Sequence, residues 1–323
     1  MITHAAQFLN AQIYRYTTKE KARYFLRGAR QRFLPAKNLI AGPFAGEFGY
    51  ELMQWQGYIR ARRKCYDATH LITYPGREYL YEGCTVSFHD IRLEKAGYSY
   101  GLISPAESIL LARKQAAALG WKSYDIFIPA LLCTQYHKRF LWKQDFRLLE
   151  EPPLDGRVHD VAFHFRAVRK DGPDLSKNYP PAFADELAHR CLEAGLSVIC
   201  IGHPDYAYCA SGCEDRRRVD LQESVAAIHS ARLVAGENSG PMHLANLCGK
   251  PTVLWANDQW RIDYSLRWNP FQVPIYVAAN DSATPAPEKL LAAIRDALRD
   301  LAQKTADFSE PCYKLPGQQI AYY

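Results

Sequence analysis

The residues with the clearest capacity for chemistry lie in one stretch, Leu233 to Leu254. Its pattern predicts a buried strand, a polar turn, a short helix that begins near Pro241, and a second buried strand. Gly236 and Gly240 allow the backbone to turn and to approach a ligand closely. Free backbone N–H groups from Ser239 to His243 would then point out of the helix N-terminus at the carboxyl end of a strand, where phosphate binds. An ordinary strand–helix–strand turn that binds nothing is the alternative.

A basic loop follows the first strand expected in the second half of the chain, residues 158–165. Its potential phosphate-binding side chains are His164, Arg166, Arg169, Lys170 and Lys177. Arginine offers a planar fork to phosphate oxygens, and lysine offers a point charge. For any single residue the alternative is a solvated side chain. The grouping at the carboxyl end of a strand nevertheless favours a second part of the same phosphate site.

The segments 238–245 and 249–253 resemble the sugar-nucleotide motif of the heptosyltransferase-type glycosyltransferases, family nine of the GT-B class. That motif reads Asp-Ser/Thr-Gly-x-x-His-Leu-Ala, followed by Gly-Lys-Pro and a strand. The helix and strand that precede it match residues 220–234, and a weaker likeness extends from about Val161 to Trp255. The chain departs from the family in having Asn238 where the family has an acid. The resemblance implies donor binding by Asn238, Ser239, Gly240, Pro241, Met242 and His243.

Two further likenesses extend the expected site. Lys177-Asn-Tyr-Pro180 resembles a Lys-x-Trp-Pro element of the same family, whose lysine reaches the donor phosphate. The His164-Phe-Arg166 segment is faintly similar to the His-x-Arg of fucosyltransferases that bind a guanosine diphosphate sugar. The donor-binding residues expected in this loop are therefore His164, Arg166, Arg169 and Lys177.

A candidate catalytic base lies in the first half of the chain. Gly46-Glu47 stands where the family has Gly-Asp, in a loop between a strand and a helix near the acceptor. The resemblance implies that Glu47 removes the proton from the acceptor hydroxyl. The alternative is a carboxylate that compensates the positive end of a helix, worth about 0.3–1 kcal/mol.

Alternating strands and helices are expected to position these residues. Capping and periodicity predict helices at 50–63, 105–119, 181–194, 221–229 and 287–304. Strands are predicted at 38–44, 70–74, 124–128, 158–165, 196–201, 251–256 and 273–277. Such alternation requires parallel, doubly wound sheets. With the resemblance, it predicts an α/β chain of GT-B type, with two Rossmann-like doubly wound parallel-sheet domains that face a cleft.

The same patterns suggest how the chain is divided. The 323 residues are 48% hydrophobic, enough for two domains with large cores. Residues 150–153, polar and rich in proline, are the expected linker. The predicted segments are a basic helical segment at 1–37, an acceptor-side domain at 38–150, a donor-binding domain at 151–305 and a tail at 306–323.

Charge is concentrated at the start of the chain. Residues 1–37 contain eight basic residues and one acidic residue, whereas the net charge of the whole chain is +6. A basic helix with interspersed aromatic residues can lie on an anionic membrane. The alternative is a terminal helix that packs across the two domains. Charge alone gives no reason to expect nucleic acid as a partner.

Nine scattered cysteines, an odd number, favour reduced thiols in a cytoplasmic protein. No apolar run approaches the ~20 residues that span a bilayer, and Met1 to Asn10 lack the features of a secretory signal. A zinc site is conceivable, but the spacing of its ligands fits no familiar pattern. The residues concerned are Cys200, His203, Cys209 and Cys213. We therefore expect no metal and no cofactor apart from the donor itself.

Together these features predict a glycosyltransferase that moves a sugar from a nucleotide-diphosphate donor to a hydroxyl of a glycan or lipid-linked acceptor. Because the chain has no Asp-x-Asp motif, we expect a metal-independent reaction. We also expect the reaction to invert the configuration of the sugar. The expected location is the cytoplasm, and the basic segment would place the chain at the inner face of the membrane unless it packs across the two domains. Two alternatives remain: a GT-B epimerase or hydrolase that acts on sugar nucleotides, and a catalytically silent module that binds sugar nucleotide or glycan.

Overall fold

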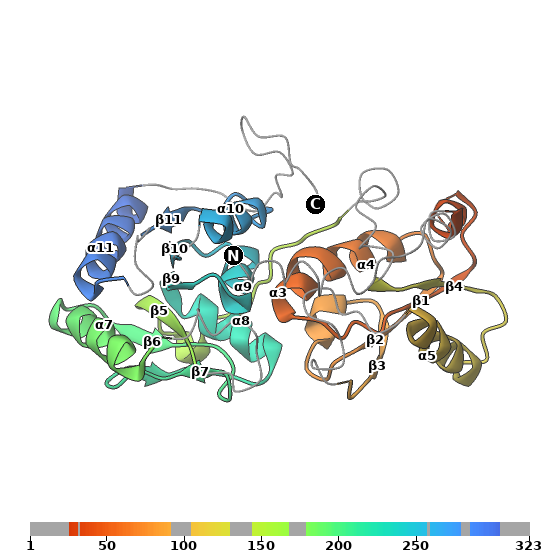
Figure 1. Ribbon diagram of the computed structural model, residues 1–323, viewed down its shortest axis with the longest axis horizontal. Coiled ribbons are helices and arrows are strands. Elements are labelled where there is room, and N and C mark those ends of the chain that lie inside the picture. Colours follow the sequence, from red (N-terminus) through yellow and green to blue (C-terminus); the bar gives the residue numbers. More distant parts are fainter. Residues whose placement is uncertain are drawn as a thin grey trace, which may run out of the picture. The chain divides into compact units, whose positions relative to one another are not determined.

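The computed structural model describes residues 26–31, 33–91, 105–129, 144–167, 179–256, 259–278 and 285–303 (Figure 1). The chain divides into two compact units, of which the first ends at Asp145 and the second begins at Phe146. Each unit is built on a sheet whose main strands run parallel, with helices between them in sequence. The α/β architecture of two Rossmann-like sheets, predicted from the sequence, is confirmed.

The first unit has a four-stranded parallel sheet in the order β3-β2-β1-β4. Its strands are β1 (Asn38–Ala41), β2 (Ala68–Thr73), β3 (Thr85–Phe88) and β4 (Tyr124–Phe127). Its helical segments are α3 (Phe48–Tyr50), a π-helical turn (Glu51–Trp55), α4 (Gln56–Arg63), a 3-10 turn (Glu78–Tyr81) and α5 (Pro105–Ala118). The helix predicted at 50–63 is therefore present but interrupted by a wider turn.

Aromatic packing joins that helix to the first sheet. Leu52, Trp55 and Ile59, which recur at helical spacing, are completely buried as expected. The indole of Trp55 stacks between Phe127 of β4, at a ring-centroid distance of 5.3 Å, and Phe44, at 5.7 Å. Large aromatic side chains dominate the burial energy of such cores, so this stack fixes the loop after β1 against the sheet.

The second unit has a larger sheet in the order β11-β10-β9-β5-β6-β8, and the short β7 pairs antiparallel with β5. Its strands are β5 (His159–Arg166), β6 (Val198–Cys200), β7 (Ala207–Tyr208), β8 (Glu214–Asp215), β9 (Ala231–Glu237), β10 (Thr252–Trp255) and β11 (Ile275–Val277). Its α-helices are α7 (Pro181–Glu193), α8 (Leu221–His229), α9 (Gly240–Leu247), α10 (Gln259–Arg267) and α11 (Pro287–Gln303).

Helices cover both faces of this sheet. Leu233 and Ala235 of β9 join the core that α7 and α11 form on one face, where the two helices lie side by side (Figure 1). Because successive strand residues point to opposite faces, Gly236 faces the other way, toward Met242 of α9. The sheet is therefore doubly wound, as the sequence predicts.

Candidate functional site

The second sheet has its topological switch point between β5 and β9. From β5 the chain adds β6 on one side and later returns to add β9 on the other. Ligands of open parallel sheets bind outside the carboxyl ends of the strands at such a point. His164 lies opposite Gly236 in the strand register, and the 239–243 turn follows directly after β9. The structure thus places His164, from one expected part of the donor site, next to the strand end that leads into the turn at 239–243.

The N-terminus of α9 opens at this point. Ser239 is its N-cap residue, with extended backbone angles (φ −157°, ψ 169°), and its side chain does not cap the helix. The Ser239 hydroxyl instead lies 3.0 Å from Nδ1 of His164, so the cap is tied to β5. Ser239, Gly240 and Pro241 are partly exposed. The first N–H groups of a helix lack intrahelical partners and carry partial positive charge, which makes this end suitable for phosphate.

His164 supports the turn as a neutral group. Its side chain is buried, and burial together with the positive charge of Arg166 lowers its pKa from the usual 6.5 to about 4. A neutral imidazole has one donor and one acceptor nitrogen, so the contact with Ser239 can form in either direction. We conclude that His164 positions the turn rather than supplying positive charge to a phosphate.

Two glycines make room for this histidine. A Cβ on Gly202, which has φ +115°, would lie 2.8 Å from Cδ2 of His164. A Cβ on Gly236 would lie 2.9 Å from the sulfur of Met242 and 3.0 Å from the carbonyl oxygen of His164. The sequence suggested that Gly236 allows close approach of a ligand. That interpretation is corrected here, because the space beside Gly236 is filled by protein.

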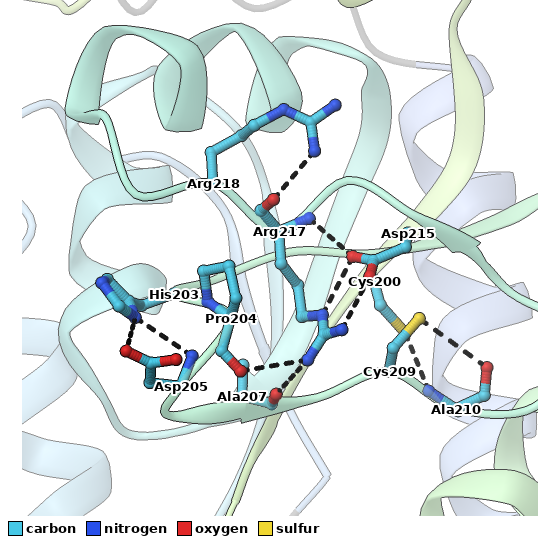
Figure 2. A network of polar contacts seen from close by, with 10 residues as sticks. All are labelled: Cys200, His203, Pro204, Asp205, Ala207, Cys209, Ala210, Asp215, Arg217 and Arg218. Atoms are coloured by element: carbon cyan, nitrogen blue, oxygen red, sulfur yellow. Dashed lines mark hydrogen bonds and ion pairs between the residues drawn. The ribbon is translucent and has the colours of Figure 1, made fainter.

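The loop after β6 is held by Arg217, as Figure 2 shows. Its guanidinium binds both carboxylate oxygens of Asp215, at 2.9 and 2.6 Å, and donates to the carbonyl oxygens of Pro204 and Ala207 at 3.2 and 2.7 Å. Such a bidentate, charge-assisted contact is strong, and it also fixes the relative orientation of the two side chains. The loop therefore keeps Gly202 against the imidazole.

A buried polar network lies under the turn. Arg261 of α10 pairs with the Glu237 carboxylate at 3.1 Å, and the Tyr179 hydroxyl donates to the same carboxylate. The Asn238 amide donates to the Arg261 carbonyl oxygen at 3.1 Å and to the Ser265 hydroxyl. Because an aspartate could not donate to that carbonyl, asparagine fits this site. Asn238 thus attaches the turn to α10.

The other expected donor residues fall into two groups. Met242 and His243 are buried, and the His243 ring packs edge-on against Trp268 at a centroid distance of 4.9 Å. Arg166 is the last residue of β5 and is partly exposed. Arg169 and Lys177 lie outside the described residues. Among the expected donor residues that the structure describes, those accessible to a ligand are therefore Ser239, Gly240, Pro241 and Arg166.

The comparisons with known proteins agree with this architecture. No family model matches the chain, and no curated protein matches it by sequence. Among solved structures, a glycosyl transferase of family 9 from Veillonella parvula superposes with a TM-score of 0.52 at 11% identity, over 82% of this chain and 98% of that one. E. coli ADP-heptose lps heptosyltransferase II superposes with a TM-score of 0.50 at 14% identity, over 82% and 99%.

The chain has the GT-B fold of the family-nine glycosyltransferases. In this GT-B chain, Glu47 follows β1 at the switch point of the first sheet, between β1 and β4. It is the N-cap residue of α3, is half-buried, and makes no capping hydrogen bond with its side chain. A carboxylate at this position is placed to meet a ligand at the carboxyl edge of its own sheet.

Glu51 is a residue whose role sequence reasoning missed. It lies one helical turn beyond Glu47 and is the first residue of the π-helical turn. Its side chain is completely buried, where it accepts hydrogen bonds from Thr73 at 3.0 Å and Tyr81 at 2.7 Å. A buried carboxylate is costly to perturb. The sequence signal available was an acid among the apolar positions of the predicted helix.

Over the residues that the structure describes, no group of three or more histidine, cysteine or acidic side chains is arranged to hold a metal ion. Within the same residues, no helix is long and apolar enough to cross a bilayer.

Proposed function

We propose that this protein is a glycosyltransferase that moves a sugar from a nucleoside-diphosphate sugar to a hydroxyl group of a glycan or lipid-linked acceptor. The observation that carries the proposal is the partly exposed N-terminus of α9 at the switch point, tied to β5 by the Ser239–His164 contact. The first backbone N–H groups of a helix have no carbonyl partner within it, so this end is where a diphosphate would bind. Two solved structures with a similar fold are named as glycosyl transferases, one of them for ADP-heptose.

Glycosyl transfer releases a nucleoside diphosphate, so the site must stabilise negative charge that grows on phosphate. We propose that the first N–H groups of α9 do this with Arg166, and that Lys177 joins them. Preorganised donors at the position of developing charge are a large source of catalysis. In this proposal no metal is needed, and attack on the opposite face of the sugar inverts its configuration.

The acceptor hydroxyl must lose a proton as it attacks. We propose that Glu47 takes it, because this half-buried carboxylate follows the central strand β1 and has no capping partner of its own. General base catalysis by a positioned carboxylate contributes about 10²–10⁴-fold. Donor binding is thus assigned to the second unit and acceptor activation to the first.

We further propose that residues 1–37 bring the enzyme to an anionic membrane at its cytoplasmic face. The segment is strongly basic, and its described part presents Leu26, Phe33 and Leu34 with 66, 75 and 73% exposure. Gln31 anchors the same segment by donating to the carbonyl oxygen of Ile126 at 2.8 Å. Apolar and basic side chains together bind anionic interfaces. Sedimentation with phosphatidylglycerol vesicles but not with phosphatidylcholine vesicles tests this.

Ligand-induced stabilisation tests the donor site. A nucleoside diphosphate that binds only the folded state raises the free energy of unfolding by RT ln(1 + [L]/Kd). We expect one diphosphate of a base panel to raise the melting temperature of the wild type. Ser239→Val should reduce the rise, whereas Ser224→Ala, at a partly exposed position of α8, should leave it unchanged. No stabilisation of the wild type by any member of the panel would refute the donor site.

A further inference from the structure

The first unit contains a buried charge for which the proposed reaction gives no role. Glu51 is completely buried, and its Oε1 accepts from Thr73 and Tyr81. Its Oε2 is also buried and receives no hydrogen bond within the described part of the chain. It begins the π-helical turn in which the Gln56 N–H reaches back to the Glu51 carbonyl oxygen. Incompletely satisfied buried charges and π-helical turns both concentrate at functional sites.

The carboxylate of Glu51 forms an ion pair with Arg77. Nε of Arg77 lies 3.8 Å from Oε2 of Glu51, and the guanidinium carbon lies 3.9 Å from the centre of the Phe48 ring. The arginine is thus held between a buried carboxylate and an aromatic face. The Arg77 side chain is 25% exposed. Among the described residues, its two terminal nitrogens have no hydrogen-bond partner. A fixed guanidinium with a free fork is preorganised to bind two neighbouring oxygen atoms.

This fork lies at the edge of the sheet where the acceptor is expected. Thr73, which binds Glu51, is the last residue of β2, and β2 neighbours β1, whose following loop carries Glu47. Phe48, on which Arg77 rests, is the residue after Glu47. Arg77 therefore lies at the carboxyl edge of the sheet, beside the segment that begins with the proposed base.

The local charge indicates the kind of ligand. Glu51 compensates the charge of Arg77, and the half-buried Glu47 contributes a further negative charge close to Phe48. A phosphate or carboxylate would meet no net positive charge there, and it would be repelled by the buried Glu51. Neutral hydroxyl oxygens can accept from the guanidinium without that repulsion.

We propose that Arg77, oriented by Glu51 and Phe48, binds two adjacent hydroxyl groups of a neutral sugar. This rests on the proposed function, because it names the chemical class of the acceptor. Arg77 is a substrate-binding residue in this scheme, and Glu51 is a positioning residue that acts through it.

Saturation-transfer NMR on the full chain tests the proposal with defined probes. These are the methyl glycosides of glucose, galactose and mannose, with glucuronate and glucose 6-phosphate as charged counterparts. We expect at least one neutral glycoside to bind, and neither charged sugar to bind more tightly. Arg77→Ala should weaken that binding at least about tenfold, the effect of losing charge-assisted hydrogen bonds. Arg77→Lys should not restore it, because lysine has no fork.

The controls separate this site from the donor site and from misfolding. Arg113→Ala, on the exposed surface of α5, should bind the glycoside like the wild type. Glu51→Gln should weaken glycoside binding while a nucleoside diphosphate stabilises the second unit as before. Because Arg77 is partly exposed, its variants test the site even if Glu51→Gln fails to fold. Tighter binding of the charged sugars, no binding of any neutral glycoside, or unchanged binding by Arg77→Ala would each overturn the proposal.

Discussion

Replacing His164 with glutamine should reduce the loss of stability that acid causes in this protein. The pKa of His164 is lowered to about 4 in the folded chain, chiefly by burial and also by Arg166, whereas the unfolded value is near 6.5. Between these two values the unfolded chain binds a proton that the folded chain does not. The contribution of the uncharged His164 to the free energy of unfolding is therefore complete at neutral pH. It is lost as the pH falls from about 6.5 toward 4.

The size of the effect follows from the two pKa values. Integrating the proton uptake of one such group from pH 7 to pH 4.5 gives a loss of about 2 kcal/mol. Glutamine retains a polar group near Ser239 but does not titrate. The variant should therefore have a lower free energy of unfolding at pH 7 and a shallower decline with acid.

Urea unfolding at a series of pH values, followed by tryptophan fluorescence, measures this decline. The same substitution at His189, which is 70% exposed on α7, is the matched control and should retain the wild-type slope. Other buried histidines are present in both proteins, so their contributions to the pH dependence of the free energy of unfolding cancel when the two are compared. If wild type and His164→Gln lose stability in parallel between pH 7 and 4.5, His164 is not the neutral, buried support described here.

Three further outcomes are expected at the proposed site. Gly240→Val should block approach of a diphosphate to α9 and lower its affinity in calorimetric titration; equal affinity in a folded variant would exclude the turn. Arg166→Ala and Lys177→Ala should each weaken diphosphate binding about tenfold and leave binding of the bare nucleoside unchanged. Equal losses of affinity for both ligands would mean that these residues only shape the loop. Glu47→Gln should lower kcat about 10²–10⁴-fold at constant donor affinity, unlike Glu78→Gln at an exposed position of the first unit; near wild-type turnover would exclude Glu47 as the base.

Periodicity and capping predicted the elements that carry the donor turn. Asp220 caps α8 by accepting from the Glu223 N–H at 2.9 Å, as its spacing suggests. The apolar stripe of α11 is buried in the second core. These features depend on residues close together in sequence, which is why they can be read without the fold.

Other elements could not be predicted from local pattern. In α10, Trp260, Ile262, Tyr264 and Leu266 alternate with polar residues, which is typical of a strand, yet the segment is helical. Its attachment to Asn238 and Glu237 comes from residues more than twenty positions away. The edge strand β3 is short and half polar, and it is defined by pairing with β2. Such contacts exist only after the chain has folded.

The same limit applies to the sites. The sequence indicated the turn at 239–243, but not that Ser239 would contact His164 or that Met242 would be buried. The Glu51–Arg77 contact joins residues from two separate connections of the sheet. Local spacing cannot reveal such a pair, because its members meet only through the sheet register.

The most direct test of the central claim is to incubate the full chain with a panel of nucleotide sugars, with and without glycan acceptors, and to measure released nucleoside diphosphate and glycosylated product together. The account predicts that one donor releases its diphosphate in step with product, only when an acceptor is present and equally well after metal chelation. Donor conversion at the same rate without acceptor would instead show an epimerase or hydrolase. Binding of a sugar nucleotide with no turnover under any condition would contradict transfer and show a binding module.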